Sequence, residues 1–193
     1  MVFENTENYF WQSSRIRLRP MRSDDWELRH QESTDSEGFR RMNYTVELPK
    51  SPDMDQEWVE RGIDFKEKDT RLMFSIESLS GELVGGINLG GRDQKNGTFS
   101  FGLRTFRPYR RKGYAEDAVR IILRYAFHEL RFQKCNSSCI ETNRASITLH
   151  KKLGFKEEGI RRRTIYTNGK YHDEILFGLT REEFDGSVQD KNE

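Results

Sequence analysis

The chain has 193 residues and a formal net charge of +1; 34% of the residues are hydrophobic, 34% are charged and 12% are aromatic. This length suits one domain with its own core, the near-neutral charge excludes nucleic-acid binding by bulk electrostatics, and no apolar run approaches the ~20 residues that span a bilayer. Residues 1–14 lack the basic and apolar segments of a signal peptide, and the two cysteines lack the spacing of a metal site. We therefore expect a cytoplasmic protein with reduced thiols, no metal, and neither a membrane nor a nucleic acid as its partner.

The first elements along the chain are predicted to be a strand and a helix. Residues 15–21 alternate between apolar and polar side chains, as a half-exposed strand does. Ser23 is placed to cap a helix with Asp24 and Asp25 in its first turn, where negative charge is favourable. Residues 33–50 are expected to be irregular and polar.

A second helix and three strands are predicted next. Ser51-Pro52-Asp53 combines a cap, a proline at the first helical position and an acid, which is typical of a helix start. From residue 71 the period changes to two, and residues 71–89 predict a hairpin that turns at Ser80-Gly81. A polar loop is expected over 90–97, followed by a strand over 99–105.

A short basic turn, Arg110-Arg111-Lys112-Gly113-Tyr114-Ala115, joins this strand to a long amphipathic helix. The first N–H groups of a helix have no intrahelical partner and carry partial positive charge, so that an anion can dock on them. Gly113 would let the backbone approach such a ligand closely. Taken alone, the turn is either a phosphate site or a solvated basic loop.

The last third of the chain predicts a strand over about 134–141, a helix after Asn143 that ends at Gly154, and a hairpin around Asn168-Gly169. Residues 185–193 are expected to fray. The resulting order of strands and helices is that of a mixed α/β (α+β) chain and does not alternate as a doubly wound fold would.

Two segments together resemble the signature of the GCN5-related N-acetyltransferase (GNAT) family. Arg110, Gly113 and Ala115 match the family's (Gln/Arg)-x-x-Gly-x-(Gly/Ala) pyrophosphate loop, and residues 143–155 are similar to its Asn-x-x-Ala/Ser … Lys-Leu-Gly-Phe helix. Arg17-Leu18-Arg19-Pro20 and the later segments look most like the branch that includes the ribosomal-protein N-terminal acetyltransferases (RimJ/RimL-like).

The resemblance implies a fold and a domain organisation. The expected fold is a mixed, mostly antiparallel sheet of about seven strands, splayed at its middle and flanked by about four helices. Residues 15–182 would form the single acetyltransferase domain, with 1–14 as an N-terminal extension and 183–193 as a C-terminal tail. A homodimer through the C-terminal strands is compatible with the family.

The resemblance also implies acetyl-CoA as the co-substrate and a primary amine as the acceptor, either a protein N-terminus or a small molecule, which attacks directly in a ternary complex. The pyrophosphate would rest on the basic turn, and pantetheine would run along the preceding strand. The residues expected to contact the cofactor are Leu103, Arg104, Thr105, Arg110, Arg111, Lys112, Gly113, Tyr114, Ala115, Asn143 and Ser146.

The catalytic residues are less clear because the chain departs from the family pattern. Ser100 stands where many relatives carry a glutamate base, and His150 stands where many carry a tyrosine acid. Ser146 is the preferred partner for the leaving thiolate. His150 is either an alternative acid or a half-exposed helix residue, and Glu141 is either a base or an exposed strand-end carboxylate. Asp173 and Glu174 are further candidates for the base.

The acceptor is expected to bind between residues 33–50, which hold Arg40, Arg41, Tyr44 and Glu47, and the segment before Asn168, which holds Arg161, Arg162, Arg163 and Tyr166. The three consecutive arginines either attract an acidic acceptor or form a solvated face. The alternative function is a non-catalytic acyl-CoA-binding or sensing module of the same fold, which the missing glutamate and tyrosine favour.

Overall fold

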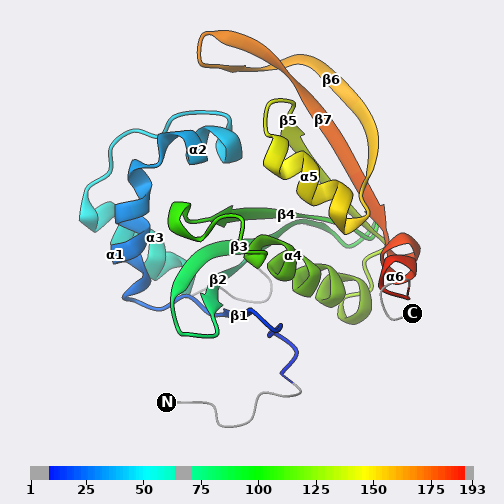
Figure 1. Ribbon diagram of the computed structural model, residues 1–193, viewed down its shortest axis with the longest axis horizontal. Coiled ribbons are helices and arrows are strands. Elements are labelled where there is room, and N and C mark those ends of the chain that lie inside the picture. The colour runs from blue at the N-terminus through cyan, green and yellow to red at the C-terminus, as the bar shows by residue number, and fades with distance from the viewer. Residues whose placement is uncertain (1–8, 64–70, 190–193) are drawn as a thin grey trace.

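The computed structural model describes residues 9–63 and 71–189, which form a seven-stranded sheet flanked by helices (Figure 1). The strand order is β1-β2-β3-β4-β5-β7-β6, and all neighbouring strands are antiparallel except β4 and β5. The strands are β1 Ile16–Arg19, β2 Leu72–Ser78, β3 Leu83–Asp93, β4 Thr98–Thr105, β5 Lys134–Ile140, β6 Lys156–Thr167 and β7 Lys170–Thr180. The predicted mixed, mostly antiparallel sheet is confirmed.

The described residues contain six α-helices, which is two more than the sequence suggested. They are α1 Asp25–Gln31, α2 Ser36–Asn43, α3 Pro52–Ile63, α4 Tyr114–Arg124, α5 Arg144–Leu153 and α6 Arg181–Gln189. Two short 3-10 turns, Glu32–Thr34 and Arg107–Tyr109, and a π-helical turn, Tyr125–Glu129, complete the helical segments.

The two additional helices correct two predictions. Residues 33–50 are not irregular throughout, because the Asp35 carboxylate accepts a hydrogen bond from the Gly38 N–H and so begins α2, which buries Phe39. Residues 185–189 are not frayed, because they continue α6, which buries Phe184. Residues 190–193 and 1–8 lie outside the described part of the chain.

Two element boundaries also differ from the prediction. Ser23 does not cap the first helix: Asp24 precedes α1 without a side-chain cap, and the Asp25 carboxylate accepts a hydrogen bond from the Arg22 N–H instead. Strand β3 runs as far as Asp93, so the first part of the expected loop over 90–97 is strand.

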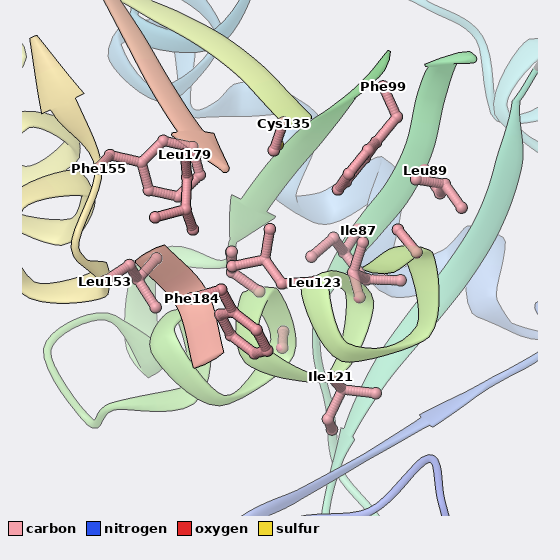
Figure 2. Close-up of a cluster of buried hydrophobic side chains, with 14 of the residues drawn as sticks. Ile87, Leu89, Phe99, Ile121, Leu123, Cys135, Leu153, Phe155, Leu179 and Phe184 are labelled. Carbon is pink, nitrogen blue, oxygen red and sulfur yellow. The ribbon is translucent and has the colours of Figure 1, made fainter. Parts of the chain in front are cut away.

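The main core lies between the sheet and helices α4 and α5. The apolar side of the amphipathic helix predicted after the basic turn is buried in α4, where Ala118, Val119, Ile122 and Leu123 are each fully enclosed. Figure 2 shows the end of this core, where Leu153, Phe155, Leu179 and Phe184 gather. Burying such side chains stabilises the fold by about 1.5–3 kcal/mol each, so α4 and α5 are held firmly against the sheet.

Strands β4 and β5 diverge at the middle of the sheet. They pair only at Thr98 with Lys134 and at Phe99 with Cys135. Beyond this point β4 continues with β3 as its partner, and β5 continues with β7. Helix α2 contacts both β4 and β5. The divergence expected from the resemblance is therefore present, and it sets the position of the candidate site.

Candidate active site

The N-terminus of α4 begins where the basic turn leaves β4. Gly113 has a left-handed backbone (φ 83°) and no side chain caps the helix. The first intrahelical bond runs from the Asp117 N–H to the Gly113 carbonyl, so the three N–H groups before Asp117 have no partner within the helix. This end of α4 therefore presents donors and partial positive charge to an anion.

Two carboxylates in the first turn of α4 are neutralised by cations. Asp117 binds Arg15, with Nε–Oδ2 2.8 Å and Nη2–Oδ1 2.5 Å, and Glu116 binds Lys152 at 2.6 Å. Although burial acts to raise it, hydrogen bonds from Arg15 and Ser13 hold the pKa of Asp117 below its ordinary value. An anion arriving at the helix N-terminus consequently meets paired rather than free carboxylates.

The structure gives Gly113 a second role. A Cβ built on Gly113 would collide with the guanidinium of Arg15, so a side chain here competes with the Arg15–Asp117 pair. Close approach of a ligand is thus not the sole reason for glycine at this position.

The basic residues of the turn point in different directions. Arg110 pairs with Asp35 at the start of α2 and donates from Nε to the Thr105 carbonyl at 3.2 Å. Its side chain therefore ties the turn to the opposite face of the sheet. Arg111 and Lys112 are exposed beside the N-terminus of α4.

The edge of β4 that faces β5 has no strand partner from Ser100 to Thr105. Leu103, Arg104 and Thr105, the residues expected to contact pantetheine, lie in this stretch. A backbone edge without a strand partner can accept an extended ligand in the manner of an added strand.

Helix α5 brings Asn143 and Ser146 to the other side of the divergence. The Asn143 side chain caps the helix by accepting a hydrogen bond from the Ser146 N–H at 3.2 Å. The Ser146 hydroxyl hydrogen-bonds to the thiol of Cys139 on β5, where burial raises the pKa of the thiol. Ser146 as a whole is partly exposed, and its hydroxyl also lies 3.4 Å from Nδ1 of His150.

His150 is a core residue and not a half-exposed one. Its ring is 3% exposed and stacks on Phe177 with centroids 4.5 Å apart. Nδ1 lies 2.8 Å from the Ser146 carbonyl and Nε2 lies 2.8 Å from the Ser137 hydroxyl. A carbonyl only accepts, so Nδ1 carries the proton and Nε2 accepts from Ser137. Burial lowers the pKa of His150, which favours this neutral form.

Glu141 lies at the end of β5 and is already engaged. Its Oε1 is 2.7 Å from Nδ1 of His172 on β7, and its Oε2 is buried without a hydrogen-bond partner in the described part of the chain. The structure therefore joins Glu141 to a second titratable group that the sequence analysis did not single out.

Glu174 on β7 stands beside β5 in a more enclosed position. Its Oε1 accepts hydrogen bonds from the Ser138 hydroxyl at 2.7 Å and the Tyr44 hydroxyl at 3.4 Å, while Oε2 accepts from Arg161 at 3.2 Å. Burial raises the pKa of Tyr44, so its phenol stays protonated and can donate. Sequence reasoning named Glu174, but missed Ser138, because only the pairing of β5 with β7 brings these residues together.

The two segments expected to bind the acceptor do meet. Arg40 on α2 donates to the Thr167 hydroxyl at the tip of the β6–β7 hairpin at 2.8 Å, and Tyr44 reaches Glu174. In Figure 1 this hairpin arches beyond the sheet on the side of α2. Arg162 and Arg163 lie exposed on β6, as expected of residues on a solvated strand face.

Cys139 and Ser138 are neighbours on β5, and their side chains point to opposite faces of the sheet. The face of Cys139 is packed against α5 and carries Ser146, whereas the face of Ser138 carries Glu174 and Tyr44. The divergence of β4 and β5 therefore lies between a helix N-terminus on one side and a hydrogen-bonded carboxylate on the other.

Residues 9–63 and 71–189 contain neither a candidate metal site nor a candidate membrane-spanning helix. No group of three or more His, Cys, Asp or Glu side chains there could hold a metal ion. None of the helices in the same ranges has the length and hydrophobicity needed to cross a bilayer.

Comparison with known proteins gives a consistent result. Residues 15–156 match the family model described as acetyltransferase (GNAT) domain. The SPbeta prophage-derived uncharacterized N-acetyltransferase YokL of Bacillus subtilis is 40% identical over 176 residues, which cover 91% of this chain and 96% of YokL. The putative ribosomal N-acetyltransferase YdaF of the same species is 32% identical over 106 residues, covering 55% of this chain and 58% of YdaF.

Among solved structures, the fold resembles spermidine N-acetyltransferase from Vibrio cholerae in complex with CoA and spermine. The TM-score is 0.76 at 21% identity, and the match covers 89% of this chain and 99% of the other. At this identity the likeness concerns the fold alone. The family match spans most of the chain and agrees with the sheet, its divergence and the turn before α4, and the chain therefore belongs to the GNAT family of acetyltransferases.

Proposed function

We propose that the protein transfers the acetyl group of acetyl-CoA directly to a primary amine. The observation that carries this proposal is the divergence of β4 and β5 after Phe99, which lies between the free N-terminus of α4 and the face that holds Glu174. The proposal assigns the donor to the α4 and α5 face and the amine to the α2 face.

The residues of the donor side fit the parts of acetyl-CoA. The partnerless N–H groups at the start of α4, with Arg111 and Lys112, suit the pyrophosphate. The edge of β4 over Leu103, Arg104 and Thr105 suits the amide-containing pantetheine arm. Acetyl-CoA supplies an acyl group activated as a thioester, so the protein needs neither an acyl-enzyme nucleophile nor a metal in this proposal.

The residues that flank the divergence would accept the proton of the acceptor ammonium and stabilise the departing thiolate. Glu174 would accept a proton from the acceptor ammonium, directly or through water; its hydrogen bonds from Tyr44 and Arg161, in the two segments proposed to bind the acceptor, support this role. Ser146 is placed to donate a hydrogen bond to the departing thiolate. His150 acts indirectly in this scheme, since its ring is enclosed and both nitrogens are engaged.

Thermal unfolding with and without acetyl-CoA tests the donor site. A ligand at 100 times its Kd stabilises the folded state by about 2.7 kcal/mol, so we expect a clear rise in Tm. Gly113→Glu should abolish the rise by placing a side chain and a negative charge at the N-terminus of α4. Gly81→Glu is the matched control, because Gly81 has a similar φ of 88° in open space.

Release of free thiol with an amine panel tests the transfer. Thiol release that depends on the amine supports the enzyme. A Tm shift of the wild type without thiol release for any amine would instead favour a non-catalytic acyl-CoA-binding module, and no Tm shift at all would refute the donor site.

A further inference from the structure

Two arginines lie side by side on the α2 face of the sheet. Arg104 on β4 is in register with Gly86 on β3. The guanidinium of Arg29, from α1, covers Gly86, since a Cβ there would lie 3.2 Å from its Nη1 and 3.3 Å from its Nη2. Directly opposed strand residues are about 4.5–5.5 Å apart at Cα, so the Arg104 side chain starts beside the Arg29 guanidinium, and, besides burial, the positive charge of Arg104 contributes to lowering the pKa of Arg29.

Arg29 lacks a counterion among the described residues. Its Nη2 donates to the Ser75 hydroxyl at 3.1 Å and its guanidinium lies over the Trp58 ring, but its Nε is buried and has no hydrogen-bond partner there. The nearby carboxylate of Asp25 is held by two hydrogen bonds from Arg19, at 2.8 and 2.9 Å. Burial lowers the pKa of Arg29 to about 10, in keeping with an enclosed cation that is short of negative charge.

Arg104 is in a similar state. It stacks on Phe39, with its guanidinium carbon 3.9 Å from the ring centroid, and donates to the main-chain carbonyl of Glu32. Its Nε is also buried without a partner in the described ranges. The neighbouring carboxylate of Asp35 is bound to Arg110, so Arg104 forms no ion pair with a described residue.

An enclosed charge without a partner is costly, and two like charges next to each other increase the cost. A bound anion would offset this free-energy cost by pairing with both cations. Guanidinium groups bind carboxylates through two parallel hydrogen bonds, which gives geometric selectivity as well as affinity. The strand positions beside the pair, Gly86 and Gly102, are partly exposed, and the side chains that lie over them are polar, Arg29 over Gly86 and Asn88 over Gly102. A small anion on this face would therefore meet nitrogen donors.

We propose that Arg29 and Arg104 form a carboxylate-binding subsite, and that the preferred acceptors are small amines that carry a carboxylate, such as amino acids or short peptides. The subsite lies on the face that carries Glu174 and Ser138, and Arg104 belongs to the stretch of β4 that has separated from β5. The inference rests on the proposed function, because it names the class of acceptor for the same site.

The test compares matched acceptors with the full-length wild-type protein. Thiol release from acetyl-CoA is measured for a panel of free amino acids and dipeptides, for the corresponding carboxamides, and for spermidine. We expect kcat/KM for the best carboxylate acceptor to exceed that of its carboxamide by about tenfold or more, the scale of a charge-assisted hydrogen bond. Equal or better use of the carboxamide or of spermidine would overturn the inference.

Variants then assign the preference to the arginines. Arg29→Gln and Arg104→Gln should each reduce the ratio of acid to amide towards one, mainly through KM for the acid. In Arg29→Gln, which changes no residue of the proposed donor site, the Tm shift with acetyl-CoA should persist. Arg104→Lys keeps the positive charge but cannot form two parallel hydrogen bonds, so its ratio of acid to amide should lie between those of the wild type and Arg104→Gln. Arg61→Gln is the control, because Arg61 is exposed on α3 and pairs with Glu57 alone among the described residues.

The outcomes separate this inference from the proposed function. A preference for the acid that survives both Gln substitutions overturns the subsite. Acetyl-CoA binding without transfer to any carboxylate acceptor overturns it as well. Absence of acetyl-CoA binding overturns the proposed function itself. If a Gln variant does not fold, the wild-type ratio and the Arg104→Lys variant still decide the question.

Discussion

Arg15 and Asp117, separated by 102 positions in the chain, form an ion pair with two hydrogen bonds. The pair connects the residue just before β1 to the first turn of α4. Because the guanidinium also lies against Gly113, this ion pair directly contacts the turn that we propose to bind the pyrophosphate. The geometry of the donor site therefore depends on the start of the domain as well as on the turn itself.

Gly113→Ala is expected to destabilise the fold more than Gly81→Ala. Both glycines have φ above 80°, so each substitution carries the left-handed strain of about 1–2 kcal/mol. Only the alanine at 113 also displaces Arg15, which adds about 1 kcal/mol for the disturbed ion pair. Urea unfolding measures both values. In Arg15→Ala the difference between the two substitutions should vanish, and its persistence would contradict the clash.

Asp25→Asn is expected to cost about 1–3 kcal/mol at neutral pH, because Arg19 loses one of its two buried carboxylate partners among the described residues and keeps only Glu77. Burial acts to raise the pKa of Asp25, but hydrogen bonds from Arg19 and Ser75 hold it below its ordinary value. The carboxylate therefore stabilises the fold above pH ~4, and this contribution is lost as the pH falls through the lower folded-state value.

Unfolding measured between pH 7 and pH 3 checks this assignment. The variant should show a shallower loss of stability in acid than the wild type. Asp53→Asn, at the exposed start of α3, should cost no more than about 0.3–1 kcal/mol, the scale of a surface charge in the first turn of a helix, and should change the slope less than Asp25→Asn does.

His150→Phe is expected to weaken the pH dependence of stability near pH 6. Burial lowers the pKa of His150, so the folded protein holds it neutral while the unfolded chain takes up a proton below about pH 6.5. Stability must then fall as the pH drops through this range, by up to about 1.4 kcal/mol per pH unit. Urea unfolding at pH 5.5 and 7.5 should show a smaller difference in the variant.

Ser146→Ala is expected to lower kcat by about 10²-fold with little change in KM for acetyl-CoA, if its hydroxyl supports the departing thiolate. Thr148→Ala is the control from the same helix, because Thr148 is exposed. Steady-state thiol release gives both constants. A change confined to KM would indicate binding rather than support of the leaving group.

Glu174→Gln is expected to lower kcat/KM most strongly at low pH, where the acceptor amine arrives protonated and needs a base. The amide keeps the size of the carboxylate, and its oxygen can still accept from Ser138. A pH profile of kcat/KM on any acceptor that the wild type uses checks this prediction. Equal profiles for variant and wild type would exclude Glu174 as the base.

Local patterns in the sequence predicted much of the fold, and the exceptions have physical reasons. The strands that alternate and the apolar stripe of α4 were predicted because burial imposes a period on them. Helix α2 was missed because it buries one large apolar side chain, Phe39, and carries Gly38 in its first turn. Helix α6 likewise depends on Phe184. Neither helix has a stripe that could be read without its tertiary partner.

The candidate site was predicted unevenly for the same reason. Gly113 and Asn143 stand at helix starts, where the local sequence carries the signal. The contact of Ser138 with Glu174 arises from strand pairing across 36 positions, and Arg29 reaches Gly86 from another element. Contacts of this kind follow from register and topology, which no local pattern specifies.

The aromatic ring of Trp11 stacks on Phe74 with centroids 5.1 Å apart, and the main-chain carbonyl of Trp11 accepts a hydrogen bond from the Leu18 N–H. Ser13 adds a hydrogen bond to Asp117 at 2.7 Å. We therefore propose that the folding unit begins before residue 15, where the family match starts. A recombinant fragment trimmed to that homology boundary would lose these contacts of Trp11 and Ser13, including the hydrogen bond to α4. Expression work should therefore keep the leading residues and place affinity tags at a distance from Trp11.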